Sequence, residues 1–345
     1  MTAIQRTGLW PDYSISRLIK GGWHLAGGHG EVDQTQAIDD MARFVEAGIT
    51  TFDCADHYTG VEELIGDFRA AYPDLAPKIQ IHTKFVPDLG TLETCDGAYV
   101  ERIIDRSLQR LRVERLDLVQ FHWWDFAVAR HVEIALHLED LRQSGKIDRI
   151  GVTNYDMAHL GQLLDAGVPV AVHQLQYSLI DDRPEHGMVA FCKDHGIALL
   201  CYGTLAGGFF APRWLGAAEP QTPFTNRSLT KYKLIIDEFG GWDLFQQLLS
   251  ALDMVATRHG VSIGQVAVRW LLDRPGAAAA IVGATSTRHL AANEAIFGLA
   301  LDQEDRDRIE DVLALREGPP GDCYGLERDR EGPHGRIMRY NLNER

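Results

Sequence analysis

Short apolar runs alternate with longer amphipathic stretches along most of the chain. The short runs are rich in β-branched and aromatic residues, as in buried strands, whereas the long stretches repeat apolar positions at helical spacing. Strands are predicted at residues 17–20, 50–53, 79–85, 116–121, 149–152, 171–174, 198–202 and 279–282. Helices are predicted at residues 34–47, 61–71, 99–111, 131–144, 157–166, 185–194, 244–258, 263–272 and 288–296. Strands that alternate with helices at intervals of roughly thirty residues predict an α/β fold of the (β/α)8 TIM-barrel type.

Two segments interrupt this alternation. A Gly- and Pro-rich stretch at residues 203–241 lies between the last two predicted strands, and insertions of this kind are usually binding loops. The charged stretch 317–345 also contains Tyr324, Met338 and Tyr340, and we expect it to fold back over the barrel mouth. The chain is therefore predicted to be a single barrel domain at residues 1–316 with a C-terminal extension at residues 317–345.

Composition limits the partners of such a barrel. The chain carries a formal net charge of -15, and its cysteines have neither a CxxC nor a zinc spacing. The acidic balance argues against nucleic acid or an anionic membrane as a partner, although a local group of donors can still bind a polyanionic cofactor. The cysteine pattern is typical of reduced thiols in a cytoplasmic protein. The longest apolar stretch, at residues 277–284, is too short to span a bilayer, so no membrane insertion is expected.

Polar side chains at the ends of three consecutive strands indicate a catalytic site. Asp53 ends the second strand and Tyr58 follows it, Lys84 lies near the end of the third, and His122 follows the fourth. Barrel enzymes place their catalytic groups at these carboxyl ends. Each residue alone has a structural explanation, such as a lysine that reaches the surface or a hydrogen-bonded core histidine. Together they supply what carbonyl reduction needs: a phenol that protonates the alkoxide, a cation that lowers its pKa, a carboxylate that holds the cation and an imidazole that orients the carbonyl.

The same residues stand in longer motifs that resemble one family. The motifs are Phe52-Asp53-Cys54-Ala55-Asp56-His57-Tyr58, Thr83-Lys84, the run 116–122, Ile150-Gly151-Val152-Thr153-Asn154, Gln174 and the segment 202–208. In this order, over roughly residues 15–300, they resemble the aldo-keto reductase superfamily. The resemblance implies a nicotinamide-dependent oxidoreductase without a metal. It also implies Tyr58 as general acid and base, Lys84 and Asp53 as the pair that tunes it, and His122 as the residue that orients the carbonyl.

The resemblance further implies a cofactor site. Asn154 and Gln174 would hold the nicotinamide carboxamide beside Thr153, and Tyr202 would stack on the ring. The other residues implied to approach the cofactor are Gly21, Gly22, Trp23, Asp53, Leu205, Gly207, Gly283, Thr285, Ser286, Arg288, His289 and Asn293. The residues expected to line the substrate pocket are Trp23, Tyr58, His122, Trp123 and Trp124, an aromatic set suited to a flat or apolar carbonyl compound.

Three positions depart from the family pattern. Thr59 stands where the family usually has glycine, which is expected to shift the loop more than the phenol. Val282 replaces a common proline, and Gly283 stands where some branches have a lysine for the 2'-phosphate of NADP. Arg288 and His289 remain candidate partners for that phosphate, so NADP(H) is favoured and NAD(H) stays possible.

Other functions leave different signatures. A metal-dependent barrel hydrolase needs a ligand set such as HxH at its first strand or HExxH, and a Rossmann dehydrogenase needs G-x-G-x-x-G after a strand; the sequence has none of these. The alternative that stays open is a nicotinamide-binding sensor or regulatory subunit with little turnover, because one fold serves many functions. The expected partner is a small-molecule carbonyl or alcohol substrate, and the chain is expected to be a monomer or a small homo-oligomer.

Overall fold

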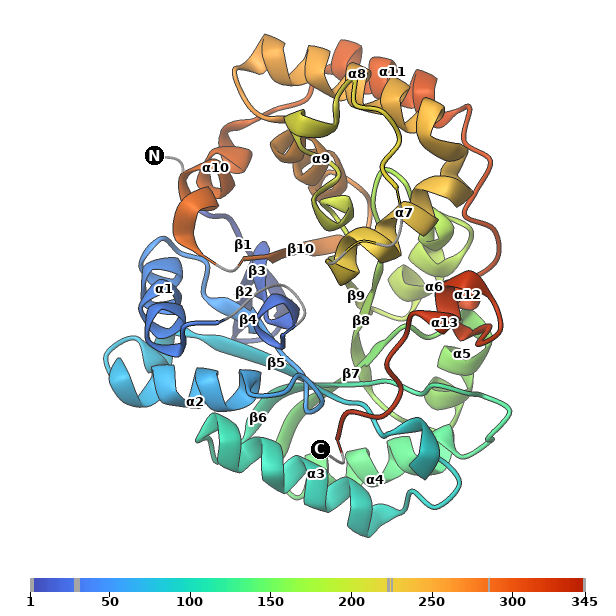
Figure 1. The fold of residues 1–345 in the computed structure, drawn as a ribbon. Helices are drawn as coiled ribbons and strands as arrows, with labels where there is room; N and C mark the ends of the chain where they lie inside the picture. The colour runs from blue at the N-terminus through green and yellow to red at the C-terminus, as the bar shows by residue number, and fades with distance from the viewer. Residues whose placement is uncertain (1–2, 28–31, 222–223, 225, 285, 344–345) are drawn as a thin grey trace.

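The predicted barrel is present, and helices surround it on the outside (Figure 1). The computed structural model describes residues 3–27, 32–221, 224, 226–284 and 286–343. The barrel strands are β3 (Leu18–Gly21), β4 (Thr51–Asp53), β5 (Gln80–Phe85), β6 (Leu116–Phe121), β7 (Ile147–Thr153), β8 (Val170–Gln176), β9 (Ala198–Tyr202) and β10 (Ala277–Gly283). They are parallel and follow one another in chain order, and β10 closes the ring against β3. The (β/α)8 prediction is confirmed, with some strand ends shifted by one or two residues.

Helices connect the strands, largely where the sequence predicts them. They are α1 (Gln34–Glu46), α2 (Val61–Ala71), α3 (Gly97–Leu111), α4 (His131–Gln143), α5 (Met157–Asp165), α6 (Met188–Asp194), α7 (Arg227–Phe239), α8 (Gly241–His259), α9 (Ile263–Leu272), α10 (Leu290–Ala295), α11 (Gln303–Leu313), α12 (Gly325–Arg328) and α13 (Pro333–Arg336). The helix predicted at 185–194 is preceded by a separate 3-10 turn, Arg183–Glu185. In place of the one predicted at 288–296, α10 lies between 3-10 turns at Thr287–His289 and Ile296–Gly298. Among the helices of the described residues, none is long and apolar enough to cross a membrane.

The stretch 203–241 is not a continuous loop, because α7 occupies its second half. Asn226 caps this helix: its side chain accepts hydrogen bonds from the main-chain N–H groups of Ser228 and Leu229 at 2.9 and 3.3 Å. Such a cap satisfies donors that a helix start leaves unpaired. The prediction of a binding loop is thus corrected to a loop followed by a capped helix.

A hairpin that the sequence pattern did not reveal, β1 (Arg6–Trp10) with β2 (Tyr13–Ser16), closes the amino end of the barrel. The main-chain N–H of Ser16 donates to Thr51 Oγ1 at 3.0 Å, at the start of β4. An apolar core fills the barrel next to the hairpin; its buried members are Ile15, Ile19, Leu118, Val172, Leu200 and Ala279. The larger core lies between the barrel and the helices. Each fully buried aliphatic side chain stabilises the fold by roughly 1.5–3 kcal/mol.

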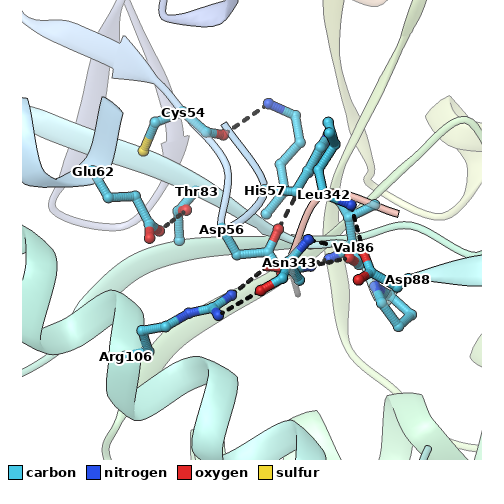
Figure 2. Close-up of polar contacts among 12 residues, drawn as sticks. Cys54, Asp56, His57, Glu62, Thr83, Val86, Asp88, Arg106, Leu342 and Asn343 are labelled. Atoms are coloured by element: carbon cyan, nitrogen blue, oxygen red, sulfur yellow. Dashed lines mark hydrogen bonds and ion pairs between the residues drawn. The ribbon is translucent and has the colours of Figure 1, made fainter. Parts of the chain in front are cut away.

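The C-terminal segment crosses the barrel mouth, as predicted; it is the red trace that runs from α12 and α13 towards α3 and α4 in Figure 1. Its last turn is fastened beside β5 (Figure 2). Asn343 donates from Nδ2 to the carbonyl oxygen of Val86 at 2.7 Å and from its main-chain N–H to Asp88 Oδ1 at 3.0 Å. Arg106 of α3 donates to Asn343 Oδ1, and Asp56 Oδ2 lies 3.4 Å from Asn343 Nδ2. The tail is therefore bound to the loop that carries Tyr58.

Candidate active site

A cavity of about 910 Å³ opens at the carboxyl ends of the barrel strands. All eight strands contribute residues at or just beyond their ends, and the rest of the wall comes from the β9–α7 connection, α7 and the C-terminal segment. Parallel strands in a closed barrel bring their ends to one face, which is why residues far apart in sequence meet there. Among the described residues, no three His, Cys, Asp or Glu side chains gather in a way that could hold a metal ion.

Asp53 and Lys84 form the buried centre of this cavity. Lys84 Nζ lies 2.7 Å from Asp53 Oδ2 and donates to the carbonyl oxygen of Cys54 at 2.9 Å. Both side chains are about 95% removed from solvent, so the pair is compensated locally rather than by water. Burial lowers the pKa of Lys84, but the charge and hydrogen bond of Asp53 together with Tyr58 and Cys54 outweigh it, and the pKa lies above the ordinary value. Lys84 is therefore a fixed positive charge.

Two glutamines hold the other oxygen of Asp53. Gln174 Nε2 donates to Asp53 Oδ1 at 2.6 Å and to Gln120 Oε1 at 2.9 Å, and Gln120 Nε2 lies 3.3 Å from Asp53 Oδ1. The sequence analysis missed Gln120. The signal was present, because Gln120 precedes His122 by two positions and side chains two apart in a strand share a face.

Tyr58 lies above this pair. Lys84 Nζ is 4.9 Å from the centroid of the Tyr58 ring, which also packs against Trp23 at 5.0 Å and His57 at 4.8 Å. Gly60 ends the loop with φ = 79°, a left-handed conformation that glycine adopts without strain, and α2 begins directly after it. Glycine at this position, rather than next to the tyrosine, is thus sufficient to turn the chain after Thr59.

The Tyr58 phenol is protonated in the folded protein. Burial raises its pKa above the ordinary value, the charge of Lys84 lowers it, and Asp53 raises it again. Lys84 lowers the pKa of Tyr58, as predicted, but burial raises it by more. Tyr58 can therefore donate a proton, with a cation nearby that stabilises the phenolate left behind.

His122 is a neutral ring with a defined tautomer. Its Nδ1 lies 3.2 Å from the carbonyl oxygen of Thr153, and since a carbonyl only accepts, Nδ1 carries the hydrogen. Burial, followed by the charge of Arg328, holds the pKa of His122 well below its usual range. Nε2 is then a hydrogen-bond acceptor, and among the described residues it has no partner. The rings of Trp124 and Tyr324 pack edge to face against it at 4.3 and 5.5 Å.

Amide and aromatic groups adjoin this centre on the β7 to β9 side. Tyr202 donates from its hydroxyl to Asn154 Oδ1 at 2.7 Å. Among the described residues, Asn154 Nδ2 and Gln174 Oε1 form no hydrogen bond, so one donor and one acceptor stay available beside the Tyr202 ring. Thr153 lines the same wall. The structure thus brings Thr153, Asn154, Gln174 and Tyr202 together, as the sequence analysis expected.

The end of the cavity near β10 is rich in cations. Arg288 donates from Nε to His289 Nε2 at 2.9 Å, and both residues line the cavity with Ser286. Arg213, Arg227 and Lys231 line the cavity as well. The His24 ring lies over Gly283 so closely that an added Cβ would be 1.9 Å from His24 Cε1. A lysine at position 283, as in some family branches, would therefore require the His24 ring to move.

Several predicted positions differ from expectation. Trp123 does not line the pocket: it is fully buried, donates from Nε1 to the carbonyl oxygen of Val128 at 3.0 Å and packs on Phe121. Among the described residues, those that line the cavity include Gly21, Trp23, Leu205 and Gly207 but neither Gly22 nor Asn293. Gly22 has a packing role instead, because a Cβ there would lie 2.7 Å from the carbonyl oxygen of Asp53. Thr285 lies outside the described residues.

Comparisons with known proteins find a matching family and similar chains. The model of the aldo/keto reductase family matches residues 17–314. The aldo-keto reductase YhdN of Bacillus subtilis is 30% identical over 322 residues, which cover 90% of this chain and 93% of the relative. The NADH-specific methylglyoxal reductase of Escherichia coli is 24% identical over 339 residues, covering 89% and 97% of the two chains. The solved glycerol dehydrogenase of Gluconobacter oxydans superimposes with a TM-score of 0.76 at 26% identity, covering 93% of this chain and 98% of that one.

Proposed function

The chain belongs to the aldo/keto reductase family, and from this premise we propose an NADP(H)-dependent oxidoreductase that reduces an aldehyde or ketone, or oxidises the matching alcohol, with Tyr58 as general acid and base. The observation that carries the proposal is the buried Lys84–Asp53 ion pair at 2.7 Å, whose ammonium lies against the Tyr58 ring. A protonated phenol beside a fixed cation is suited to protonating an alkoxide. The bound nicotinamide supplies or accepts the hydride.

Tyr58 and Lys84 have different roles in the proton transfer: Tyr58 donates the proton and Lys84 stabilises the phenolate that remains. As the carbonyl oxygen gains negative charge, Tyr58 gives up its hydroxyl proton to that oxygen. Lys84 then stabilises the phenolate, because its charge is already fixed by Asp53 and needs no rearrangement at that moment. In alcohol oxidation the same phenolate accepts the proton from the substrate hydroxyl. Asp53 acts indirectly, through the position of Lys84.

His122 is proposed to orient the substrate in a way that its tautomer restricts. With hydrogen on Nδ1, its Nε2 accepts and does not donate. It therefore fits a hydroxyl, from the substrate or from Tyr58, better than it fits a bare carbonyl oxygen. Tyr58 is then the main donor to the carbonyl in the reductive direction. This differs from the role that the family resemblance implies for His122.

The amide groups support a nicotinamide at the inner end of the cavity. A carboxamide presents one carbonyl acceptor and one amino donor, and Asn154 Nδ2 with Gln174 Oε1 offer the complementary pair. Tyr202 presents an aromatic ring beside them, on which the nicotinamide would stack. The cations at the opposite end suit the phosphates. Arg288 and His289 are the proposed partners of a 2'-phosphate, which makes NADP(H) the favoured cofactor and leaves NAD(H) as the alternative.

A substrate panel tests the proposal directly. Purified protein is mixed with NADPH or NADH and a set of small aldehydes, ketones and sugar lactols, and the loss of cofactor absorbance is followed. We expect turnover with at least one reactive aldehyde, faster with NADPH than with NADH. Cofactor binding without turnover for the whole panel would contradict the proposal and would favour the sensor or regulatory subunit instead.

A further inference from the structure

The C-terminal segment lies beyond residue 314, where the family match ends, yet it forms part of the cavity wall. Its short helix α12 ends at Arg328, whose guanidinium contacts the loops that follow β6 and β7. Nη1 donates to the carbonyl oxygens of Trp123 and Trp124, the latter at 2.9 Å, and Nη2 donates to that of Asn154 at 2.6 Å. One side chain of the tail therefore joins the loop that follows His122 to the loop that contains Asn154.

The guanidinium is held between aromatic rings. Its central carbon lies 4.0 Å from the centroid of Phe126 and 5.6 Å from that of Tyr324. A planar group with several fixed donors suits three carbonyls better than an ammonium does. One of those carbonyls belongs to Asn154, which has φ = 63°, a left-handed conformation that is uncommon without glycine. The contact from Arg328 therefore stabilises a loop conformation that the chain adopts at some cost.

A separate buried network fixes α12 in place. The carboxylate of Glu327 lies 3.0 Å from Arg183 Nη1, and Arg183 also pairs with Asp181 at 2.7 Å. All three side chains are almost completely buried. Burial raises the pKa of Glu327, but Arg183 and Lys231 lower it to about 2, so the carboxylate stays ionised. Because Glu327 directly precedes Arg328, the network fixes the point from which Arg328 reaches the two loops.

We propose that Arg328 is a positioning residue for the reaction: it fixes the loop of His122 relative to the reacting oxygen and the loop of Asn154 relative to the nicotinamide carboxamide. The proposal rests on the proposed function, because it assigns Arg328 a task in that same site. It gives the C-terminal segment a role in catalysis, whereas a purely structural cover would act on stability alone.

Arg328 also acts on His122 electrostatically. Arg328 from α12, His57 from the β4–α2 loop and Lys84 from β5 each lower the pKa of His122 in addition to burial, and the titratable Tyr324 packs against the same ring. Arg328 has the largest effect of the three. Loss of this charge should therefore raise the pKa of His122, while burial, the larger cause, keeps it below the ordinary value.

The test compares Arg328→Met, which removes both charge and donors, with Arg328→Lys, which keeps the charge but not the planar donor set. Arg308→Met is the control, since Arg308 lies on α11, pairs there with Glu304 at 3.4 Å and does not line the cavity. We expect kcat/KM to fall by about 10- to 100-fold in both Arg328 variants, the range for a small misplacement of reacting groups. NADPH should also bind more weakly to both. The control should behave like the wild type.

The pH dependence separates the two effects of Arg328. The titration of His122, followed by NMR of the labelled ring from neutral pH into the acidic range below the ordinary histidine pKa of about 6.5, should move upwards in Arg328→Met and keep the wild-type position in Arg328→Lys. Wild-type kcat/KM, cofactor affinity and His122 titration in Arg328→Met would overturn the proposal, as would equal losses in Arg308→Met. If Arg328→Met does not fold, Arg328→Lys carries the test. A wild-type protein without turnover would refute the proposed function, while cofactor affinity and the His122 titration would still decide the role of Arg328.

Discussion

The two ends of the barrel hold similar buried polar side chains but use them differently. At the amino end, Tyr13 of the hairpin hydrogen bonds with its hydroxyl to His82 Nε2 at 3.1 Å, and Ser16 donates to Thr51 Oγ1 at 3.1 Å. These groups pair with each other beneath the hairpin; His82 Nδ1 has no partner among the described residues, but His82 does not line the cavity. At the carboxyl end, by contrast, His122, Asn154 and Gln174 keep hydrogen-bonding capacity beside a cavity of about 910 Å³.

The comparison shows that buried polarity alone does not identify an active site. His82 and Lys84 lie two positions apart on β5, on the same face of the strand, yet one faces the closed end and the other the open end. Burial lowers the pKa of His82 to about 3, as strongly as in a functional site, although its partner is a structural tyrosine. A buried donor or acceptor without a partner that also lies beside a cavity is the better indicator of an active site. The following changes test that distinction.

The largest contrast is expected between the two tyrosines. Tyr58→Phe removes only the transferable proton, so single-turnover hydride transfer should slow by a factor on the order of 100 to 10000, with cofactor affinity near normal. Tyr13→Phe is the matched control at the amino end and should leave the rate unchanged. Rapid-mixing kinetics with NADPH would measure both. A Tyr58→Phe protein with a wild-type rate would show that another group is the proton donor.

The next contrast concerns the central ion pair. Lys84→Met leaves Asp53 as a buried carboxylate without its cation, so the free energy of unfolding should fall by about 3–5 kcal/mol, and turnover should be lost with it. Lys84→Met combined with Asp53→Asn removes the unpaired charge and should recover most of the stability but not the rate. Urea unfolding and steady-state kinetics on the same samples would separate the two quantities. Recovery of both together would mean that the pair only supports the fold.

A third contrast compares cations at the two ends. Arg6 spends its donors on Ser14, Thr50 and Gln80, whereas Arg288, among the described residues, forms no ion pair. Arg288→Ala should weaken NADPH binding by roughly tenfold to a hundredfold and NADH binding far less, as expected for one charge-assisted contact to a 2'-phosphate. Arg6→Ala should change neither. Dissociation constants from fluorescence titrations would test this, and equal losses for both cofactors would place the phosphate elsewhere in the cavity.

The parts of the molecule that were predictable are those that obey a local period. The strands and most helices follow from alternating or helical apolar positions, and the polar strand ends pointed to Asp53, Lys84 and His122. Neighbouring residues in a loop have no such rule: Trp123 turns into the core, while Trp124 lines the cavity. The catalytic and cofactor roles of these residues stay predictions, as does the boundary at residue 316.

Contacts between residues far apart in the chain could not be predicted from the sequence either, because they follow no local period. The hairpin depends on contacts with β4 and β5 rather than on a pattern of its own. Arg328 binds a carbonyl oxygen 205 positions earlier in the chain, and an arginine in a charged tail carries no signal of such a partner. Gln120 is different, because its spacing from His122 placed it on the same strand face.

The smallest effect on the reaction is expected at the amino end, where the change concerns stability alone. His82 is neutral when folded, because burial lowers its pKa to about 3, whereas an unfolded histidine titrates near 6.5. Between these values the unfolded chain binds a proton that the folded protein does not, so the free energy of unfolding falls as the pH falls.

The loss of unfolding free energy from His82 alone is about 1.4 kcal/mol per pH unit from about pH 6 to pH 4 and is absent above about pH 7. His82→Gln should reduce the slope of stability against pH by that amount and leave kcat unchanged, which urea unfolding at several pH values would measure. An unchanged slope, or a loss of activity with normal stability, would mean that the amino end of the barrel is not the passive counterpart of the mouth.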